Sequence, residues 1–218
     1  MTFEQVRNDH AVRVYISQAD AALKALGFTE HSFAHVTMVA DRAALILKKL
    51  CYDDRTVELA KIAGFLHDIG NVINRIDHSQ SGAVMAFRIL DRMDFPPEEI
   101  SVIISAIGNH DEGTGVPVNA VATALIIADK TDVRRSRVRN PKDVRSDVHD
   151  RVNYSVTGSD FLLDPEDKTM VLKLTVDTAI SSPMEYLEIF MKRMLLCRTA
   201  AGKLGLTFHL EINGQRLV

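Results

Sequence analysis

The residues of this chain best suited to chemistry are four histidines and two aspartates, spread over nearly a hundred positions: His35, His67, Asp68, His78, His110 and Asp129. Each lies in or beside an apolar segment with helical periodicity. Burying an imidazole or a carboxylate without a partner costs several kcal/mol, so each needs one. A shared metal centre would satisfy all six at once. Imidazole and carboxylate ligands suit iron, manganese, zinc, cobalt or nickel better than calcium.

Helices must position these ligands. The spacing of apolar residues predicts a bundle of six helices, over residues 3–26, 32–50, 55–69, 79–93, 96–109 and 118–135. His35 falls on the buried stripe of the second helix, and His31, one turn earlier, is the competing candidate. The adjacent His67 and Asp68 are expected at the end of the third helix. His110 is expected at the last turn of the fifth, and Asp129 follows the apolar run 124–128 of the sixth.

The pattern changes after Asn140-Pro141. Strands are predicted over residues 151–157, 160–164 and 169–177, with residues 164–167 as the turn of a hairpin. A helix over 183–204 and a strand over 207–212 complete the chain. We therefore expect a mainly α protein, with a helical metal-binding domain over residues 1–140 and a small α+β C-terminal subdomain over 141–218.

Composition narrows the class of protein. The chain has 218 residues, of which 46% are hydrophobic and 25% charged, as in ordinary globular proteins. The net charge of -3 gives no overall basic field for a nucleic-acid duplex. The longest apolar run, residues 121–128, is too short to cross a bilayer. The chain has only two cysteines, far apart in sequence, so we expect no disulfide framework and a cytoplasmic protein. From the charge and the short apolar run, we expect that it binds neither nucleic acid nor membrane.

The ligand pattern resembles that of the HD superfamily of metal-dependent phosphohydrolases: a His, a His-Asp pair at a helix end, and a distant Asp. The segment 63–71, Ala-Gly-Phe-Leu-His-Asp-Ile-Gly-Asn, is similar to the family's Ala-Leu-Leu-His-Asp-Ile-Gly-Lys. His78 heads His-Ser-Gln-Ser-Gly, similar to the family's His followed four residues later by a Gly that lets a helix approach closely. The resemblance implies an HD-type helical bundle.

Members of that family that hold two metals have two further histidines, in the places of His78 and His110. The resemblance therefore implies two divalent transition-metal ions bridged by Asp68, which would activate a water to attack a phosphate ester or anhydride. The substrate would be a phosphorylated small molecule. A phosphomonoester, a nucleotide and a dinucleoside polyphosphate all fit, and a homodimer is compatible with this interpretation.

The chain departs from the family at Asn71, which stands where a lysine is common; Arg75 or Lys130 is expected to replace that cation. Arginines and lysines crowd residues 130–145, and guanidinium groups suit phosphate. If the helix continues past Asp129, Asp132 shares its face and Arg137 is the arginine nearest to it. The stretch is equally well explained as a solvated helix face. The site is thus predicted to contain Asp68 and Lys130 as catalytic residues, and Asn71, Arg75, Asp132 and Arg137 as substrate-binding residues.

Other classes share these features. HD-like oxygenases use the same ligand set to hold a di-iron pair that activates dioxygen, and a non-catalytic nucleotide sensor would use the bundle only for binding. The segment 110–117 also resembles, weakly, the block of the subgroup that cleaves cyclic dinucleotides, but it lacks that block's second histidine and tyrosine. We interpret it as a loop that ends a helix.

Overall fold

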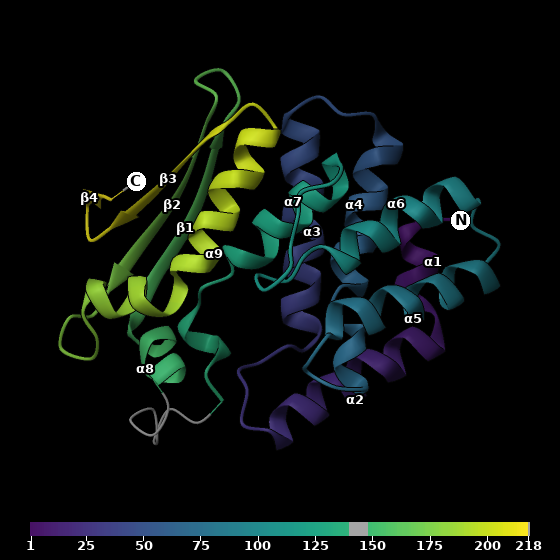
Figure 1. Ribbon diagram of the computed structural model, residues 1–218, viewed down its shortest axis with the longest axis horizontal. Helices are drawn as coiled ribbons and strands as arrows, with labels where there is room; N and C mark the ends of the chain where they lie inside the picture. The colour runs from purple at the N-terminus through teal and green to yellow at the C-terminus, as the bar shows by residue number, and fades with distance from the viewer. Residues whose placement is uncertain (140–147, 218) are drawn as a thin grey trace. The chain divides into compact units, whose positions relative to one another are not determined.

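The computed structural model describes residues 1–139 and 148–217, which fall into two compact units, Met1–Asp129 and Lys130–Val218. The mainly α fold with a C-terminal α+β part is confirmed (Figure 1). The domain boundary predicted near residue 140 coincides with the start of the stretch 140–147, which lies outside the described residues. It therefore stays a prediction.

The first unit is helical. Its elements are α1 (Phe3–Asn8), α2 (His10–Ala25), α3 (Phe33–Lys49), α4 (Asp54–Leu66), the 3₁₀ turn η1 (Ile69–Val72), α5 (His78–Arg92), α6 (Pro97–Gly108) and α7 (Ala120–Lys130). The predicted apolar stripes form its core: Val36, Val39 and Ala43 of α3 and Leu59, Ile62 and Leu66 of α4 are buried. Gly64 allows α3 and α4 to approach closely, since a Cβ there would lie 2.7 Å from Ala40 Cα.

The single helix predicted over residues 3–26 is wrong, because the helix is interrupted at Asp9. This residue has an extended backbone (φ -63°, ψ 128°), and its side chain accepts a hydrogen bond from Val12 N at 3.0 Å. An aspartate that caps a new helix competes with the continuation of the old one. The amphipathic pattern spans both helices and does not reveal the break.

Two other helices end earlier than predicted. α4 ends at Leu66, and the chain tightens into η1, where Asn71 N donates to Asp68 O at 3.0 Å. α7 ends at Lys130 instead of near residue 135. Beyond it, Val133 N donates to Thr131 O, only two residues earlier, at 3.0 Å, whereas an α-helix would need a carbonyl four residues earlier. The assumed helical phase of Asp132 and Arg137 is therefore wrong.

The second unit contains η2 (Arg135–Arg137), α8 (Val148–Ser155), β1 (Val156–Asp164), β2 (Thr169–Val176), α9 (Pro183–Lys203), β3 (Thr207–Ile212) and β4 (Gln215–Arg216). The strands form one sheet in the order β1-β2-β3-β4, antiparallel except for the parallel pair β2 and β3. α9 connects these two strands, as parallel strands require, and lies along the sheet (Figure 1).

The strand predicted over residues 151–157 is wrong, because residues up to Ser155 belong to α8. β-branched and aromatic residues alternate there and mimic a strand. The side chains favour the helix instead: Asn153 Nδ2 donates to His149 O, four residues earlier, at 2.9 Å. The later predicted strands, the hairpin turn and the long helix are present. Among the described residues, no helix is both long and apolar enough to cross a membrane.

Candidate metal centre

The first unit brings all six predicted metal ligands together. They come from five places along the chain: His35 from α3, His67 and Asp68 from the end of α4, His78 from the first turn of α5, His110 from the residues after α6, and Asp129 from the end of α7. Five are buried, and the Asp129 side chain is 11% exposed. The helix ends therefore converge on one site.

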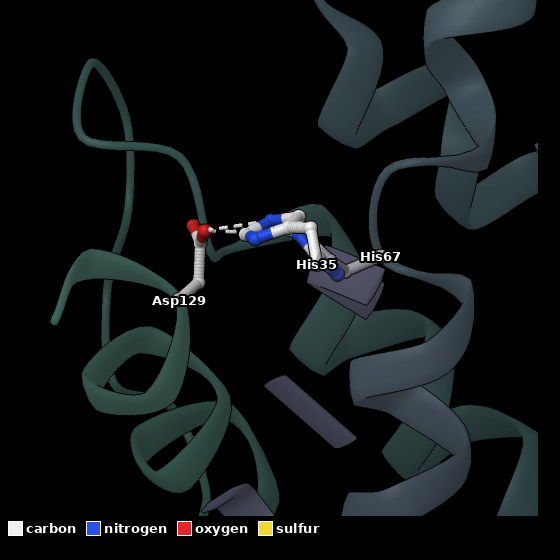
Figure 2. A group of neighbouring side chains, drawn as sticks. All are labelled: His35, His67 and Asp129. Carbon is white, nitrogen blue, oxygen red and sulfur yellow. Dashed lines mark ion pairs between the residues drawn. The ribbon is translucent and has the colours of Figure 1, made fainter. Parts of the chain in front are cut away.

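We call His35, His67 and Asp129 the first cluster. Figure 2 shows the Asp129 carboxylate pointing from α7 toward the two imidazoles. Its Oδ1 lies 3.4 Å from His35 Nε2 and 3.7 Å from His67 Nε2. One atom from each of the three residues lies within 4.8 Å of the others, which is close enough for a single metal ion to be bound by all three.

The second cluster consists of His78 and His110. Their Nε2 atoms lie 3.2 Å apart, and the ring centroids 5.1 Å apart. The ring of His110 also lies 5.0 Å from that of His67, so the two clusters are neighbours.

Asp68 stands between the clusters and presents a different oxygen to each. Its Oδ2 lies 3.1 Å from His67 Nε2 and 3.5 Å from His35 Nε2, whereas its Oδ1 lies 3.5 Å from His78 Nε2. Asn71 Nδ2 donates to the same Oδ1 at 2.9 Å and to Asp68 O at 2.9 Å, which fixes the carboxylate. A carboxylate held in this way can bridge two cations.

The backbone sets the tautomers of three histidines. Nδ1 lies 2.8 Å from Gly64 O in His67, 3.1 Å from Arg75 O in His78 and 2.6 Å from Ile107 O in His110. A carbonyl can only accept, so each Nδ1 carries the proton and each Nε2 presents its lone pair to the site. A backbone partner of this kind orients a metal-binding imidazole.

These residues fit metal ions. His67 Nε2 is buried and has no hydrogen-bond partner among the described residues, and the two Nε2 lone pairs of the second cluster face each other. A cation would provide a partner for His67 Nε2 and would separate the two facing lone pairs of His78 and His110. Burial alone raises the pKa of Asp68, but positive charge at His67 and hydrogen bonds from His35 and His67 outweigh burial and hold that pKa well below its usual value. A metal ion bound at the Nε2 atoms would supply positive charge at the same place. Asp68 is therefore an anionic ligand at neutral pH.

Two glycines hold η1 against α5 and so place Asp68 beside His78. A Cβ on Gly70 would lie 2.1 Å from His78 O and 2.5 Å from Gly82 N. A Cβ on Gly82 would lie 3.3 Å from both Gly70 N and His67 O. The close helix approach predicted at Gly82 is confirmed. Asp77, which precedes α5, has a left-handed backbone (φ 56°) that turns the chain into this contact.

Two predicted substrate-binding residues, Asn71 and Arg75, lie in the same site. Arg75 Nη1 is 3.4 Å from Asn71 Oδ1 and 3.3 Å from His78 Nε2. The competing ligand candidate, His31, has its ring 5.4 Å from that of His35 and its Nδ1 2.7 Å from Thr29 O. It belongs to neither of the metal-binding groups that the described residues form.

The other predicted residues, Lys130, Asp132 and Arg137, belong to the second unit. Asp132 accepts two hydrogen bonds from Arg134, at 2.5 and 3.0 Å, and Arg137 Nη1 donates to Asp132 O at 3.1 Å. Asp132 and Arg137 thus have contacts within their own unit. The part of the arginine-rich stretch over 140–147 lies outside the described residues. The substrate and catalytic roles of these three residues stay predictions.

Sequence reasoning missed Asp111. Its Oδ1 lies 4.0 Å from His78 Nε2, and its side chain is 27% exposed. The residue was assigned to a loop that ends a helix, and its position directly after His110 was the only available signal. It adds an acidic group on the side of the second cluster.

The region that holds these predicted ligands is similar in sequence to known proteins. The sequence model of the HD domain family matches residues 32–134. An uncharacterized protein of Methanocaldococcus jannaschii is 26% identical over 164 residues, which cover 65% of this chain and 62% of that protein. The match therefore spans less than two thirds of that relative's length.

Among solved structures, a predicted HD superfamily hydrolase from an uncultured Thermotogales bacterium is similar to this chain. The two are 23% identical with a TM-score of 0.44, and the match covers 60% of this chain and 73% of that one.

Proposed function

We propose that the protein is a metal-dependent phosphohydrolase of the HD superfamily with two metal ions, since residues 32–134 match the HD domain family. The observation that carries the proposal is the orientation of Asp68. One carboxylate oxygen faces His35 and His67, and the other faces His78. A single ion needs only one of these oxygens, whereas two ions use both.

In this proposal, His35, His67 and Asp129 hold one ion and His78 and His110 hold the other, with Asp68 shared. Bound ions of this type lower the pKa of water and neutralise charge that develops on a phosphate group. The contribution of the chain itself is to position the ligands. The three Nδ1 contacts with backbone carbonyls keep the imidazoles in register, and Asn71 keeps the Asp68 carboxylate in the orientation that serves both clusters.

The charges of the site suit an anionic substrate. Two divalent ions with Asp68, Asp129 and the nearby Asp111 still leave a net positive charge, to which Arg75 adds. A phosphate ester or anhydride of a small molecule would be attracted to such a site. A nucleotide or a sugar phosphate is compatible with these charges.

The test combines metal analysis with a screen for phosphate release. Protein treated with a chelator is reloaded separately with manganese, iron, cobalt, nickel or zinc, and bound metal is counted by elemental analysis. Each form is then assayed on nucleotides, sugar phosphates and dinucleoside polyphosphates. We expect two ions per chain and metal-dependent hydrolysis of at least one class. Two bound ions without hydrolysis of any class would contradict the proposed activity, and a mixed-valence iron signal on addition of a diol would favour an oxygenase.

A further inference from the structure

Arg75 makes an unusual contact for a cation, because it lies against a metal ligand. Its Nη1 is 3.3 Å from His78 Nε2 and 3.4 Å from Asn71 Oδ1, and its guanidinium carbon is 5.8 Å from the centre of the Phe28 ring. Among the described residues, no carboxylate forms an ion pair with Arg75. Its side chain is half-buried, whereas Asn71 and His78 are buried. Arg75 therefore lies between the second cluster and solvent.

This contact and metal binding require the same lone pair. His78 Nδ1 faces Arg75 O at 3.1 Å and carries the ring proton, so His78 Nε2 has one lone pair to offer. A guanidinium group can only donate, so the contact with Arg75 uses that lone pair. A metal ion ligated by His78 needs it too, and two cations so close repel each other. Arg75 and the second ion therefore cannot both bind His78 Nε2 at the same time.

From this competition, and resting on the proposed function, we infer that Arg75 is the phosphate-binding residue of the site and that it exchanges between two partners. It holds His78 Nε2 when the second ion is not bound, and it binds the substrate's phosphate group when the ion displaces it. The planar fork of a guanidinium suits two phosphate oxygens at once. The residue would therefore make substrate binding depend on occupancy of the second cluster.

The backbone allows this exchange without disturbing His78. The carbonyl of Arg75 faces His78 Nδ1, and the His78 amide also donates to it, at 3.4 Å. Both contacts use the main-chain carbonyl of Arg75, so they survive a change of the Arg75 side chain. A substitution at position 75 therefore tests the guanidinium group alone.

The experiment measures binding, with no turnover required. Chelator-treated wild-type protein, Arg75→Gln, Arg75→Lys and Arg88→Gln are titrated with Mn²⁺ by calorimetry. The Mn²⁺-loaded proteins are then titrated with inorganic phosphate. Arg88→Gln is the matched control, since Arg88 lies on α5 with its side chain 79% exposed and, within the described part of the chain, forms an ion pair only with Asp91, at 3.7 Å.

For Arg75→Gln we expect the second Mn²⁺ to bind at least about threefold more tightly, because a competing cation is gone. We expect phosphate to bind about tenfold more weakly or worse, the loss typical of a charge-assisted hydrogen bond. Arg75→Lys keeps the charge without the fork and should bind phosphate with intermediate affinity. Arg88→Gln should match wild type in both titrations.

The inference is overturned if Arg75→Gln binds phosphate as wild type does, or if its second Mn²⁺ binds with unchanged or lower affinity. Circular dichroism of each variant verifies its fold. Should Arg75→Gln fail to fold, Arg75→Lys decides the question, because wild-type phosphate affinity in that variant would also overturn the inference. If no phosphate ester is hydrolysed by the wild type, the proposed activity fails, while these two titrations still judge the role of Arg75.

Discussion

The two clusters of the candidate metal centre differ in their surroundings. The histidines of both clusters are buried, but those of the first cluster come from α3 and from the end of α4. The second cluster is built from the first residue of α5 and a residue just past α6, and two half-buried charged groups, Arg75 and Asp111, lie beside it. If the proposed function is correct, these charged groups make the second cluster the one that faces the substrate.

The most severe test of this comparison removes the residue that both clusters share. Asp68→Ala should lower metal-dependent phosphate release by about a thousandfold or more, because the charge and the position of both ions depend on it. The matched control is Asp41→Ala, which removes a carboxylate from α3 that is 59% exposed and pairs with Lys61. Hydrolysis by Asp68→Ala within tenfold of wild type would end the two-ion proposal. Circular dichroism separates this effect from loss of folding, to which metal binding can contribute.

Removing one histidine from each cluster distinguishes the two. His78→Ala and His110→Ala should each reduce bound metal from two ions toward one, because the first cluster keeps three ligands and Asp68. His67→Ala should disturb both ions, since its imidazole lies near Asp68 and near the ring of His110. Elemental analysis after dialysis measures the count. If His78→Ala and His110→Ala both retain two ions, these residues have structural roles only.

The junction between the clusters can be disturbed without touching a ligand. Gly70→Ala forces a methyl group to within 2.1 Å of His78 O, and we expect it to lower the free energy of unfolding by about 3 kcal/mol. It should also weaken binding of the second ion more than the first. Gly202→Ala on α9 is the control, because a Cβ there meets nothing within 4 Å. In a helix that change should be neutral or stabilising by up to about 1 kcal/mol. Equal thermal unfolding of both variants would show that the close approach is unimportant.

The substitution with the smallest expected effect lies in the second unit. Arg137→Lys keeps the charge but loses the fork, and if Arg137 binds phosphate, kcat/KM should fall about tenfold with metal content unchanged. The lysine should still be able to donate to Asp132 O, the partner of Arg137 in this unit. Kinetics equal to wild type in both Arg137→Lys and Lys130→Ala would assign no substrate role to this stretch.

The convergence of the six predicted ligands on one site could be anticipated, because each is a polar residue in an apolar helical pattern, a combination that needs an explanation. The helix breaks could not. Asp9 ends one helix by capping the next, and α7 gives way after Lys130 to a turn in which Val133 N donates to Thr131 O. Such outcomes depend on local hydrogen bonds and tertiary packing, which override periodicity. The contact between Arg75 and His78 depends on a left-handed turn at Asp77, and no sequence period encodes it.

The contact between Gly70 and the α5 backbone has a consequence for redesign of the protein. The spacing of Asp68 and His78 is set by main-chain atoms of η1 and α5, so an exchange of ligand type should leave that spacing unchanged. His78→Cys or His78→Asp would then alter which metal the second cluster prefers, since softer and harder donors select different ions. The first cluster would keep its own ligands. If the site holds two ions as proposed, changing a single side chain would be enough to give a centre that contains two different metals.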